Sequence, residues 1–177
     1  MLLQNSVALV QILNGLKMNK DARFEDGAEM PLRIKAHDAD DLRVLSALVQ
    51  DSVLPASEIS WLPQENRFAL LLNRFRWEID AKQSERVQSV LVFDCVQSVQ
   101  TDSVDAANPD QILSLLSIDL DQGKGCDAVI TLMLAGDGEI RLSAECIDVV
   151  LQDATRPYKA PSGKSPSHGL DESCQCI

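Results

Sequence analysis

Apolar residues recur with the spacing of an α-helix in one part of the chain, and this helix also has a clear start. Asp38 is a typical N-cap residue, and the acidic residues Asp40 and Asp41 favour the positive end of the helix dipole. Pro55 limits the helix, because the residue before a proline disfavours helical backbone. We therefore expect one main helix, whose buried face carries Leu42, Leu45, Leu48 and Val49.

Elsewhere the apolar residues alternate with polar ones, as in β-strands. Two such runs, Glu58–Leu62 and Phe68–Phe75, are separated by the polar residues 63–67, which is a typical hairpin connection. The run Leu70–Leu72 breaks the alternation, and this indicates a central strand buried on both faces. Further strands are expected at 32–36, 87–95, 116–121, 127–134 and 140–144, with a loop at 101–110 and turns at 122–125 and 135–138.

The apolar phase changes near Cys146 and Ile147. Before this point the apolar residues fit one strand face, and after it Ile147, Val149 and Leu151 fit the other. A bulge in a continuing strand explains the change, and a short helix that buries Ala144, Ile147, Val150 and Leu151 is the alternative. We favour the bulged strand.

The pattern predicts an α+β fold, with an antiparallel β-sheet or partly closed barrel of about six to eight strands and one main helix. A pleckstrin-homology-like barrel is one arrangement that fits. The predicted core includes Leu45, Leu48, Leu70, Leu72, Ile118, Leu132 and Leu142.

The 177 residues suit a single domain, which we place at residues 31–153. Residues 1–30 are expected to form a largely disordered N-terminal arm, and residues 154–177, rich in Pro, Ser and Gly, a disordered tail. Residues 1–17 fit either a short amphipathic helix or a misassigned start, with translation beginning at Met18. We favour the second interpretation.

Composition excludes several classes of function. The formal net charge is −11, with 16 Lys and Arg against 27 Asp and Glu. Such a balance disfavours nucleic acid and anionic membrane surfaces, which both need a basic face. We expect a cytoplasmic protein whose partner is another protein or a small anionic ligand.

The five cysteines lack secretory spacing, so we expect reduced thiols. Cys95, Cys126 and Cys146 lie in or beside apolar runs and are expected to pack as small hydrophobic residues. The two histidines, His37 and His168, have no identifiable nucleophile partner. No phosphate loop or metal motif is complete, so neither a catalytic centre, a metal site nor a cofactor is predicted.

One basic and aromatic segment is a candidate binding site. It comprises Trp61, Arg67, Arg74, Arg76 and Trp77. On a strand Arg74 and Arg76 share one face, and planar guanidinium groups bind carboxylates and phosphates well. The alternative is structural, with Phe75 and Trp77 in the core and the arginines paired to nearby acidic residues. We favour the structural alternative slightly.

Three segments, Leu42–Val53, Trp61–Trp77 and Gly138–Leu151, carry a resemblance to a known family. They resemble small, uncharacterised, mainly alphaproteobacterial proteins described as a domain of unknown function (DUF2948-like). The resemblance implies no catalytic residue. We therefore expect a non-catalytic binding or accessory domain. The alternative is a small enzyme that uses carboxylates such as Glu78, Asp94 or Glu145.

Overall fold

The computed structural model describes residues 31–79, 85–104, 108–122 and 127–159. These residues form one α-helix, two short 3₁₀ turns and eleven strands of a single antiparallel sheet. The elements in chain order are β1 (Arg33–Ala36), α2 (Ala39–Val49), β2 (Ser52–Pro55), η1 (Ala56–Glu58), β3 (Ile59–Leu62), η2 (Pro63–Glu65), β4 (Arg67–Phe75), β5 (Glu85–Phe93), β6 (Val96–Asp102), β7 (Ile112–Gln122), β8 (Ala128–Leu134), β9 (Glu139–Ala144), β10 (Val149–Asp153) and β11 (Tyr158–Lys159).

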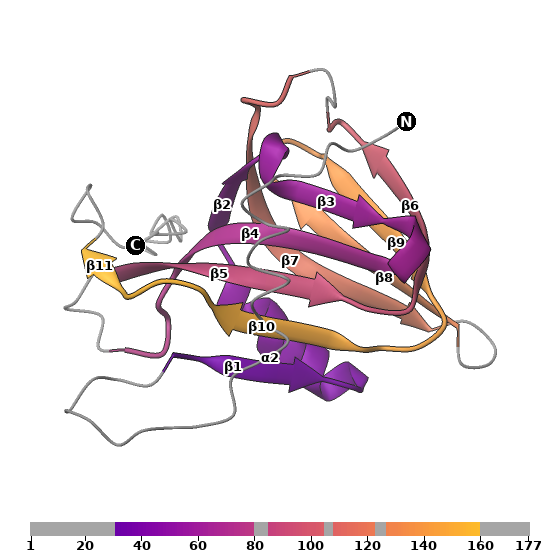
Figure 1. Ribbon diagram of the computed structural model, residues 1–177, viewed down its shortest axis with the longest axis horizontal. Coiled ribbons are helices and arrows are strands. Elements are labelled where there is room, and N and C mark those ends of the chain that lie inside the picture. Colours follow the sequence, from indigo (N-terminus) through magenta and orange to yellow (C-terminus); the bar gives the residue numbers. More distant parts are fainter. Residues whose placement is uncertain (1–30, 80–84, 105–107, 123–126, 160–177) are drawn as a thin grey trace, which may run out of the picture.

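The sheet is an open path that bends back on itself. Its strand order is β1-β10-β5-β4-β2-β7-β8-β9-β6, with β3 paired to β4 and β11 paired to β5. In Figure 1 the β1–β10–β5–β4 half crosses in front of the half that contains β7, β8 and β9. The short strand β2 joins the two halves. Of the two expected forms, an antiparallel sheet with one main helix is confirmed, and no pairing among the described strands closes the path into a barrel.

The main core lies between the two halves and beneath the helix. Leu70, Leu91, Leu132 and Leu142 from both halves are at most 1% exposed. Helix α2 contacts β1, β4 and β7, and the amide of Ile118 donates a hydrogen bond to the hydroxyl of Ser46 on the helix (2.8 Å). The helix therefore closes the space between the two halves.

The start of the helix is as predicted. Asp38 is the N-cap, and its Oδ1 accepts a hydrogen bond from the amide of Asp41 (2.8 Å). Leu42, Leu45 and Val49 are buried, whereas Leu48 is only half-buried and is a weaker core residue than expected. The helix ends at Val49, six residues before Pro55, because the chain turns at Asp51 with a positive φ of 58° and enters β2.

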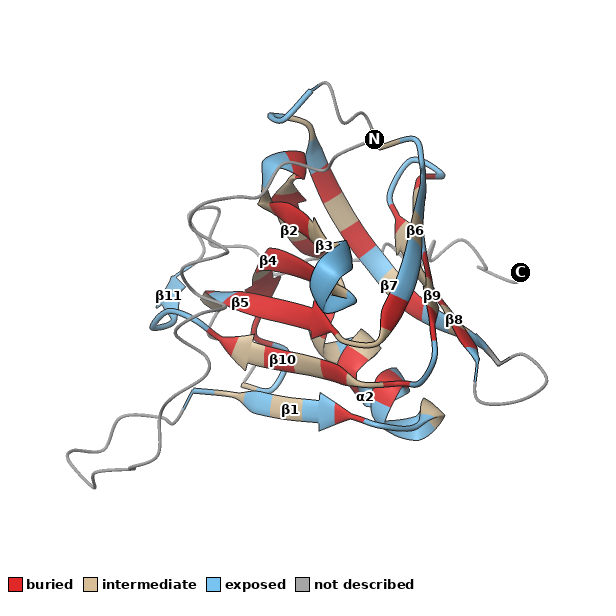
Figure 2. Cartoon of the chain, turned by 45° about the vertical axis from the view of Figure 1, so that its right-hand side comes forward, coloured by how far each residue is buried: buried red, intermediate tan, exposed pale blue. Residues whose placement is uncertain are grey.

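Strand β4 is central and is buried on both faces, as the Leu70–Leu72 run predicts. Leu70 and Leu72 face the main core, while Ala69 and Leu71 pack with Val90 and Val92 in a second apolar cluster. Figure 2 shows buried residues along most of β4 and β5. The hairpin that joins β3 to β4 through η2 is also confirmed.

The expected number of strands, six to eight, is too low. Sequence pattern misses β2, which is only four residues long, and β6, whose side chains are mostly exposed and polar. Strand β6 also extends to Asp102, into the region expected to be a loop. Its one neighbour along the sheet path is β9, and a strand at the edge needs few apolar residues.

The bulged strand expected near Cys146 is wrong. Strand β9 ends at Ala144, the chain bends through residues 145–148, and β10 begins a new strand that pairs with β5 and β1. The apolar phase changes because the chain leaves one half of the sheet and enters the other. The bend leaves Cys146 exposed and Cys95 half-buried, so Cys146 is not the packed residue that was expected.

Strand pairing continues past residue 153, the expected end of the domain. The amide of Ala154 donates to the carbonyl of Gln88 (2.8 Å), and Tyr158 and Lys159 pair with Arg86 and Glu85. The expected disorder therefore does not apply to residues 154–159. The predictions for residues 1–30, for the rest of the tail, and for Cys126 and His168 lie outside the described residues.

Candidate functional site

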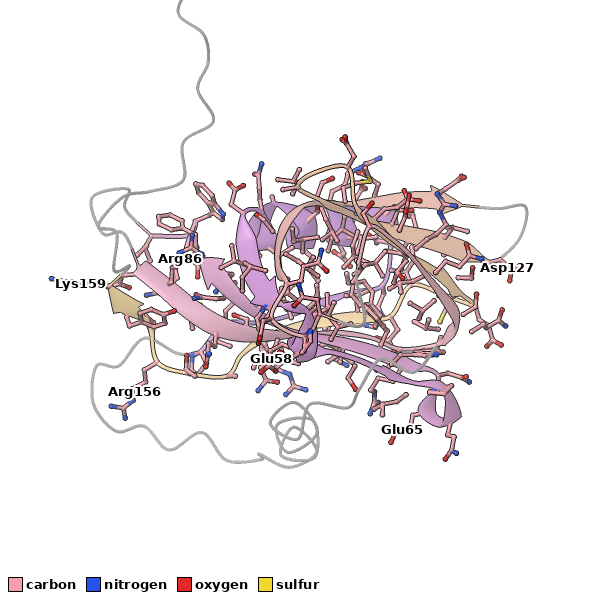
Figure 3. The ribbon with its side chains drawn as sticks, turned by 90° about the horizontal axis from the view of Figure 1, so that it is seen from above. Glu58, Glu65, Arg86, Asp127, Arg156 and Lys159 are labelled. Carbon is pink, nitrogen blue, oxygen red and sulfur yellow. The ribbon has the colours of Figure 1, made fainter. Side chains whose placement is uncertain are left out.

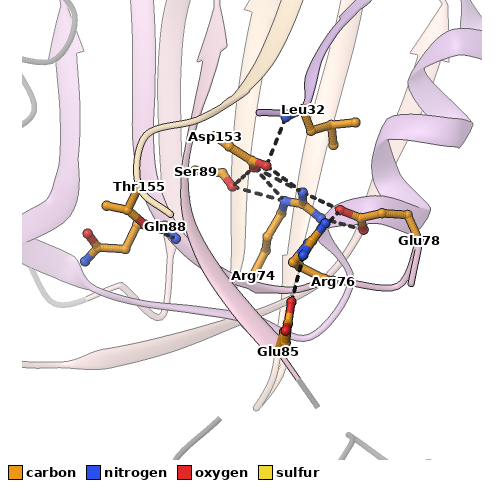
Figure 4. A network of polar contacts seen from close by, with 9 residues as sticks. All are labelled: Leu32, Arg74, Arg76, Glu78, Glu85, Gln88, Ser89, Asp153 and Thr155. Atoms are coloured by element: carbon orange, nitrogen blue, oxygen red, sulfur yellow. Dashed lines mark hydrogen bonds and ion pairs between the residues drawn. The ribbon is translucent and has the colours of Figure 1, made fainter. Parts of the chain in front are cut away.

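Arg74 lies at the centre of a buried polar network at one end of the sheet (Figure 4). Its side chain is 0% exposed. The guanidinium donates to Ser89 Oγ (3.0 Å), to both oxygens of Asp153 (3.0 and 3.2 Å) and to both oxygens of Glu78 (2.8 and 2.9 Å). Asp153 also accepts from Ser89 Oγ (2.7 Å) and from the amide of Leu32 (3.1 Å). The network joins β4, β5 and β10 to the residue before β1.

Arg76 extends the same network toward the surface. It donates to Glu85 (2.7 Å) and lies 3.5 Å from Glu78 Oε1. Burial alone would lower the pKa of Arg74, but the hydrogen bonds and charges of Glu78 and Asp153 raise it above its ordinary value. Arg74 therefore stays charged, and three carboxylates, those of Glu78, Glu85 and Asp153, lie against the two guanidinium groups.

The predicted binding residues do not form one patch. Arg67 lies at the start of β4 and pairs with Asp94 (2.7 Å) and Glu65 (3.0 Å), whereas Arg74 is seven residues along the strand. At about 3.3 Å per residue this separates them by roughly 23 Å. Arg86 pairs with Phe75 and so marks the far end of β4. In Figure 3, Glu65 and Arg86 lie toward opposite ends of the molecule.

The two tryptophans divide in the same way. Trp61 pairs in register with Phe68 near the Arg67 end and packs half-buried against the core. Trp77 is 37% exposed, contacts Phe75 with ring centroids 4.7 Å apart, and donates its Nε1–H to the carbonyl of Gln50 at the end of α2 (3.1 Å). The arginine pairings support the structural interpretation of the segment, although neither indole is fully buried.

The carboxylates proposed for an enzyme are held in ion pairs or lie at the surface. Burial alone would raise the pKa of Glu78, but hydrogen bonds from Arg74 and from the Glu78 backbone, with the charges of Arg74 and Arg76, lower it. A group that transfers protons near neutral pH needs a raised pKa, so this shift has the wrong direction. Asp94 is bound to Arg67, and Glu145 accepts from Gln97 at the surface (2.9 Å).

A pocket of about 300 Å³ lies where β4 changes its strand partner. The first part of β4 pairs with β3, up to Leu70 opposite Ile59, and β2 pairs with β4 only at Val53 and Asn73. Between these pairings the turn η1 faces β4. Backbone hydrogen bonds from Ala56 and Ser57 to residues 111 and 109 hold η1 in place (2.8 and 3.0 Å).

The walls of this pocket are mainly apolar, with a few polar groups. They consist of Val53, Leu54, Pro55, Glu58, Leu71, Leu72, Asn73, Gln88 and Ile112. Ile112, one of the wall residues, is 68% exposed. An apolar concave site with a few polar groups is the usual form of a small-molecule site.

One residue of the wall, Asn73, has a side-chain acceptor with an unmet need for a hydrogen bond. Its Oδ1 is buried and has no hydrogen-bond partner among the described residues. A buried acceptor without a donor costs about 1–3 kcal/mol, so natural proteins keep few of them. The other buried side-chain acceptor of this kind among the described residues, Ser52 Oγ, does not line the pocket. A ligand that donates an N–H or O–H group to Asn73 would remove the penalty.

Sequence pattern does not reveal this pocket. In the sequence, Asn73 is indistinguishable from a polar residue on the exposed face of a strand. Val53, Leu54 and Pro55 follow the predicted helix and look like its end. The pocket depends on β2 pairing with both β4 and β7, which no local pattern shows.

A second depression of about 330 Å³ lies between α2 and β7, with Arg43 and Asp119 among its lining residues. No unpartnered buried polar atom faces it among the described residues. Within the described part of the chain, no three His, Cys, Asp or Glu side chains are grouped to hold a metal ion, and no helix is long and apolar enough to cross a membrane. The pocket lined by Asn73, at the junction of β2 and β4, is therefore the better candidate for a binding site, and we call it the β2–β4 pocket.

Comparison with known proteins gives a family but no activity. A family model described as "Protein of unknown function (DUF2948)" matches residues 32–168. The match covers all the described strands and the helix. No curated protein and no solved structure matches the chain at a significant level.

Proposed function

The chain belongs to this DUF2948 family of unknown function, and we propose that its domain is a non-catalytic, cytoplasmic binding domain whose ligand occupies the β2–β4 pocket. The observation that carries the proposal is that Asn73, in the wall of an otherwise mainly apolar pocket, has a buried Oδ1 with no hydrogen-bond partner in the described part of the chain. An acceptor in this position is costly to the empty protein, and a bound donor would offset the cost.

The lining defines the chemical class of the ligand. Asn73 Oδ1 can accept a hydrogen bond, and the wall contains one acidic residue, Glu58, and no basic one. The remaining wall is mostly aliphatic, with Leu71, Leu72 and Ile112 among its residues. The ligand is therefore a small molecule with one apolar portion and at least one N–H donor, such as a primary amide or an amine.

The ligand is distinct from the anion suggested by the arginine-rich sequence of β4. Arg67, Arg74 and Arg76 each have carboxylate partners, so a phosphate or carboxylate ligand would have to displace an existing ion pair. None of the three lines the β2–β4 pocket. The pocket offers acceptors instead of cations.

A matched pair of probes tests the proposal. Benzamide and acetophenone are similar in size and shape, but only benzamide has N–H donors. We expect benzamide to shift NMR resonances of residues around Asn73 and to raise the melting temperature, while acetophenone has a much weaker effect. Native mass spectrometry of the purified protein would in addition show a retained natural ligand.

Two variants separate binding from stability. Asn73→Ala should weaken benzamide binding about tenfold, the effect of one hydrogen bond worth about 1.4 kcal/mol, without lowering the stability of the empty protein. Ser52→Ala removes the other unpartnered acceptor, which lies outside the pocket, and should leave binding unchanged. Equal binding of both probes, or equal binding of benzamide by wild type and Asn73→Ala, would overturn the proposal.

A further inference from the structure

Two turns that are far apart in sequence lie side by side at one end of the sheet. The first, between β5 and β6, contains Asp94 and Cys95, and the second connects β9 to β10 through residues 145–148. The amide of Glu145 donates to the carbonyl of Cys95 (3.0 Å), and the amide of Asp94 donates to the carbonyl of Asp148 (2.9 Å). Two backbone hydrogen bonds therefore fix the turns against each other.

This arrangement brings two free thiols close together, although their positions are 51 apart in sequence. The carbonyl of Cys95 accepts from the amide of Glu145, the residue before Cys146, and Val96 lies opposite Ala144 in the adjoining strands. Cys146 is exposed and Cys95 is half-buried. Cys95 also has a left-handed backbone conformation (φ 62°), which residues other than glycine seldom adopt and which occurs often at functional sites.

We propose that Cys95 and Cys146 are a reversible modification site, in which a low-molecular-weight disulfide oxidises the pair to an intramolecular disulfide that links the two turns. The backbone hydrogen bonds already hold the two turns side by side. The site is separate from the β2–β4 pocket, since neither cysteine lines that pocket.

The reaction is two successive thiol–disulfide exchanges. In the first, the thiolate of Cys146 attacks one sulfur of glutathione disulfide, a mixed disulfide forms, and one glutathione leaves as its thiolate. In the second, the thiolate of Cys95 attacks Cys146 Sγ, the protein disulfide forms, and the second glutathione leaves. The two protein thiols lose two protons and two electrons, and one glutathione disulfide becomes two glutathione thiols.

The order of the two steps follows from exposure and charge. Cys146 is the exposed thiol that a small molecule reaches first. The hydrogen bond with Cys146, then burial, then the charges of Cys146, Asp148 and Asp94 raise the pKa of Cys95 to about 11. Once Cys146 is in a mixed disulfide it has neither a thiol to share the hydrogen bond nor a negative charge, so the first-ranked cause of the raised pKa and the charge of Cys146 are both removed. Cys95 then becomes able to attack.

Other charged groups around the turns do not oppose this order. Asp94 is held by Arg67 Nε (2.7 Å), and Asp148 lies 3.8 Å from His37 Nδ1. The charges of both carboxylates raise the pKa of Cys95. They therefore favour Cys146 as the first thiol to react.

Peptide mapping of the full chain tests the proposal. The protein is equilibrated at increasing ratios of glutathione disulfide to glutathione, the free thiols are alkylated, and the chain is digested with trypsin. Cleavage after Arg86, Lys124, Arg141 and Lys159 places Cys95, Cys126 and Cys146 in three different peptides, because Pro157 blocks cleavage after Arg156. We expect a linked pair of peptides 87–124 and 142–159 that disappears on reduction.

Variants and a thermal measurement distinguish the outcomes. Cys95→Ser should stop the reaction at glutathione bound to Cys146, Cys146→Ser should form no link, and Cys126→Ser should behave as wild type. Oxidation should raise the melting temperature by about 5 °C or more, because the link closes a 51-residue segment. A persistent mixed disulfide in wild type, or preferential links from Cys95 or Cys146 to another cysteine, would overturn the proposal.

Discussion

Arg74 on β4 binds Asp153 on β10 across the strand that separates them. Two guanidinium nitrogens, Nε and Nη2, contact Asp153 Oδ1 at 3.2 and 3.0 Å, and Ser89 on the intervening β5 donates to the same oxygen. The three strands are thus joined by side chains as well as by the sheet. Because both ions are buried, removing either one would leave the other as an uncompensated charge and would destabilise the folded protein.

Removing the arginine should therefore be costly. We expect Arg74→Met to lower the free energy of unfolding by about 3–5 kcal/mol, because Asp153 is left buried without its counterion. Arg67→Met is the matched control: its carboxylate partners are 26% and 55% exposed, and the loss should be about 1 kcal/mol or less. Urea unfolding of both variants measures the difference. Similar losses in the free energy of unfolding would show that the buried Arg74 network stabilises the fold no more than the surface pairs of Arg67.

The same network should make stability depend on acid pH through Glu78. The pKa of this carboxyl is below its ordinary value of 4.5 in the folded protein, so the unfolded chain binds a proton first as the pH falls. The stabilisation from Glu78 is present above about pH 4.5 and is lost as the pH falls through the lower, folded pKa. Glu78→Gln should be less stable than wild type at pH 7, and the difference should shrink below pH 4.5 in urea unfolding. A difference that stays constant down to pH 3 would contradict this.

Two buried serines should respond in opposite directions to the same substitution. Ser52 Oγ is buried without a partner, so Ser52→Ala should raise the free energy of unfolding by about 1 kcal/mol. Ser89 Oγ bonds both Arg74 and Asp153, so Ser89→Ala should lower it by about 1–3 kcal/mol. The shift of the urea midpoint gives both signs, and a loss of stability in Ser52→Ala would mean that its hydroxyl is satisfied in solution.

The helix cap can be tested against a neighbouring acid. Asp38→Ala removes the side chain that accepts from the amide of Asp41 and should cost about 1 kcal/mol. Asp40 is exposed and forms a surface pair with Arg43, so Asp40→Ala should cost at most about 0.5 kcal/mol. Thermal unfolding compares the two, and equal effects would indicate helix-dipole stabilisation without a specific cap.

Local pattern predicts those parts of this fold that have a local cause. The helix begins at Asp38 because its cap and apolar face are encoded within a few residues, and β3 and β4 are found because each alternates or is continuously apolar. Strand β2 is missed, and β10 is expected only as the continuation of the preceding strand, because the identity of both depends on partners that are distant in sequence. At Cys146 the change of apolar phase is read correctly, but its cause is a crossing to β5 and not a bulge.

The candidate site is less predictable than the fold. The arginines of β4 are conspicuous in the sequence, and the acids that bind them are either adjacent, such as Glu78, or 79 residues away, such as Asp153. Only the adjacent pairing is visible in sequence. Asn73 has no sequence signal, because its importance comes from the loss of a hydrogen-bond partner where two strands diverge.

The short contact between β2 and β4 has a consequence for how the protein opens. One residue pair, Val53 with Asn73, joins β2 to the front half of the sheet, whereas β4 and β5 pair over eight positions. Amide hydrogen exchange measures such differences directly. The amides of Val53 and Asn73 should exchange by local separation of the two halves, while those of Leu70 and Leu91 should exchange only on global unfolding. The molecule would then admit a ligand along this seam without disturbing its core.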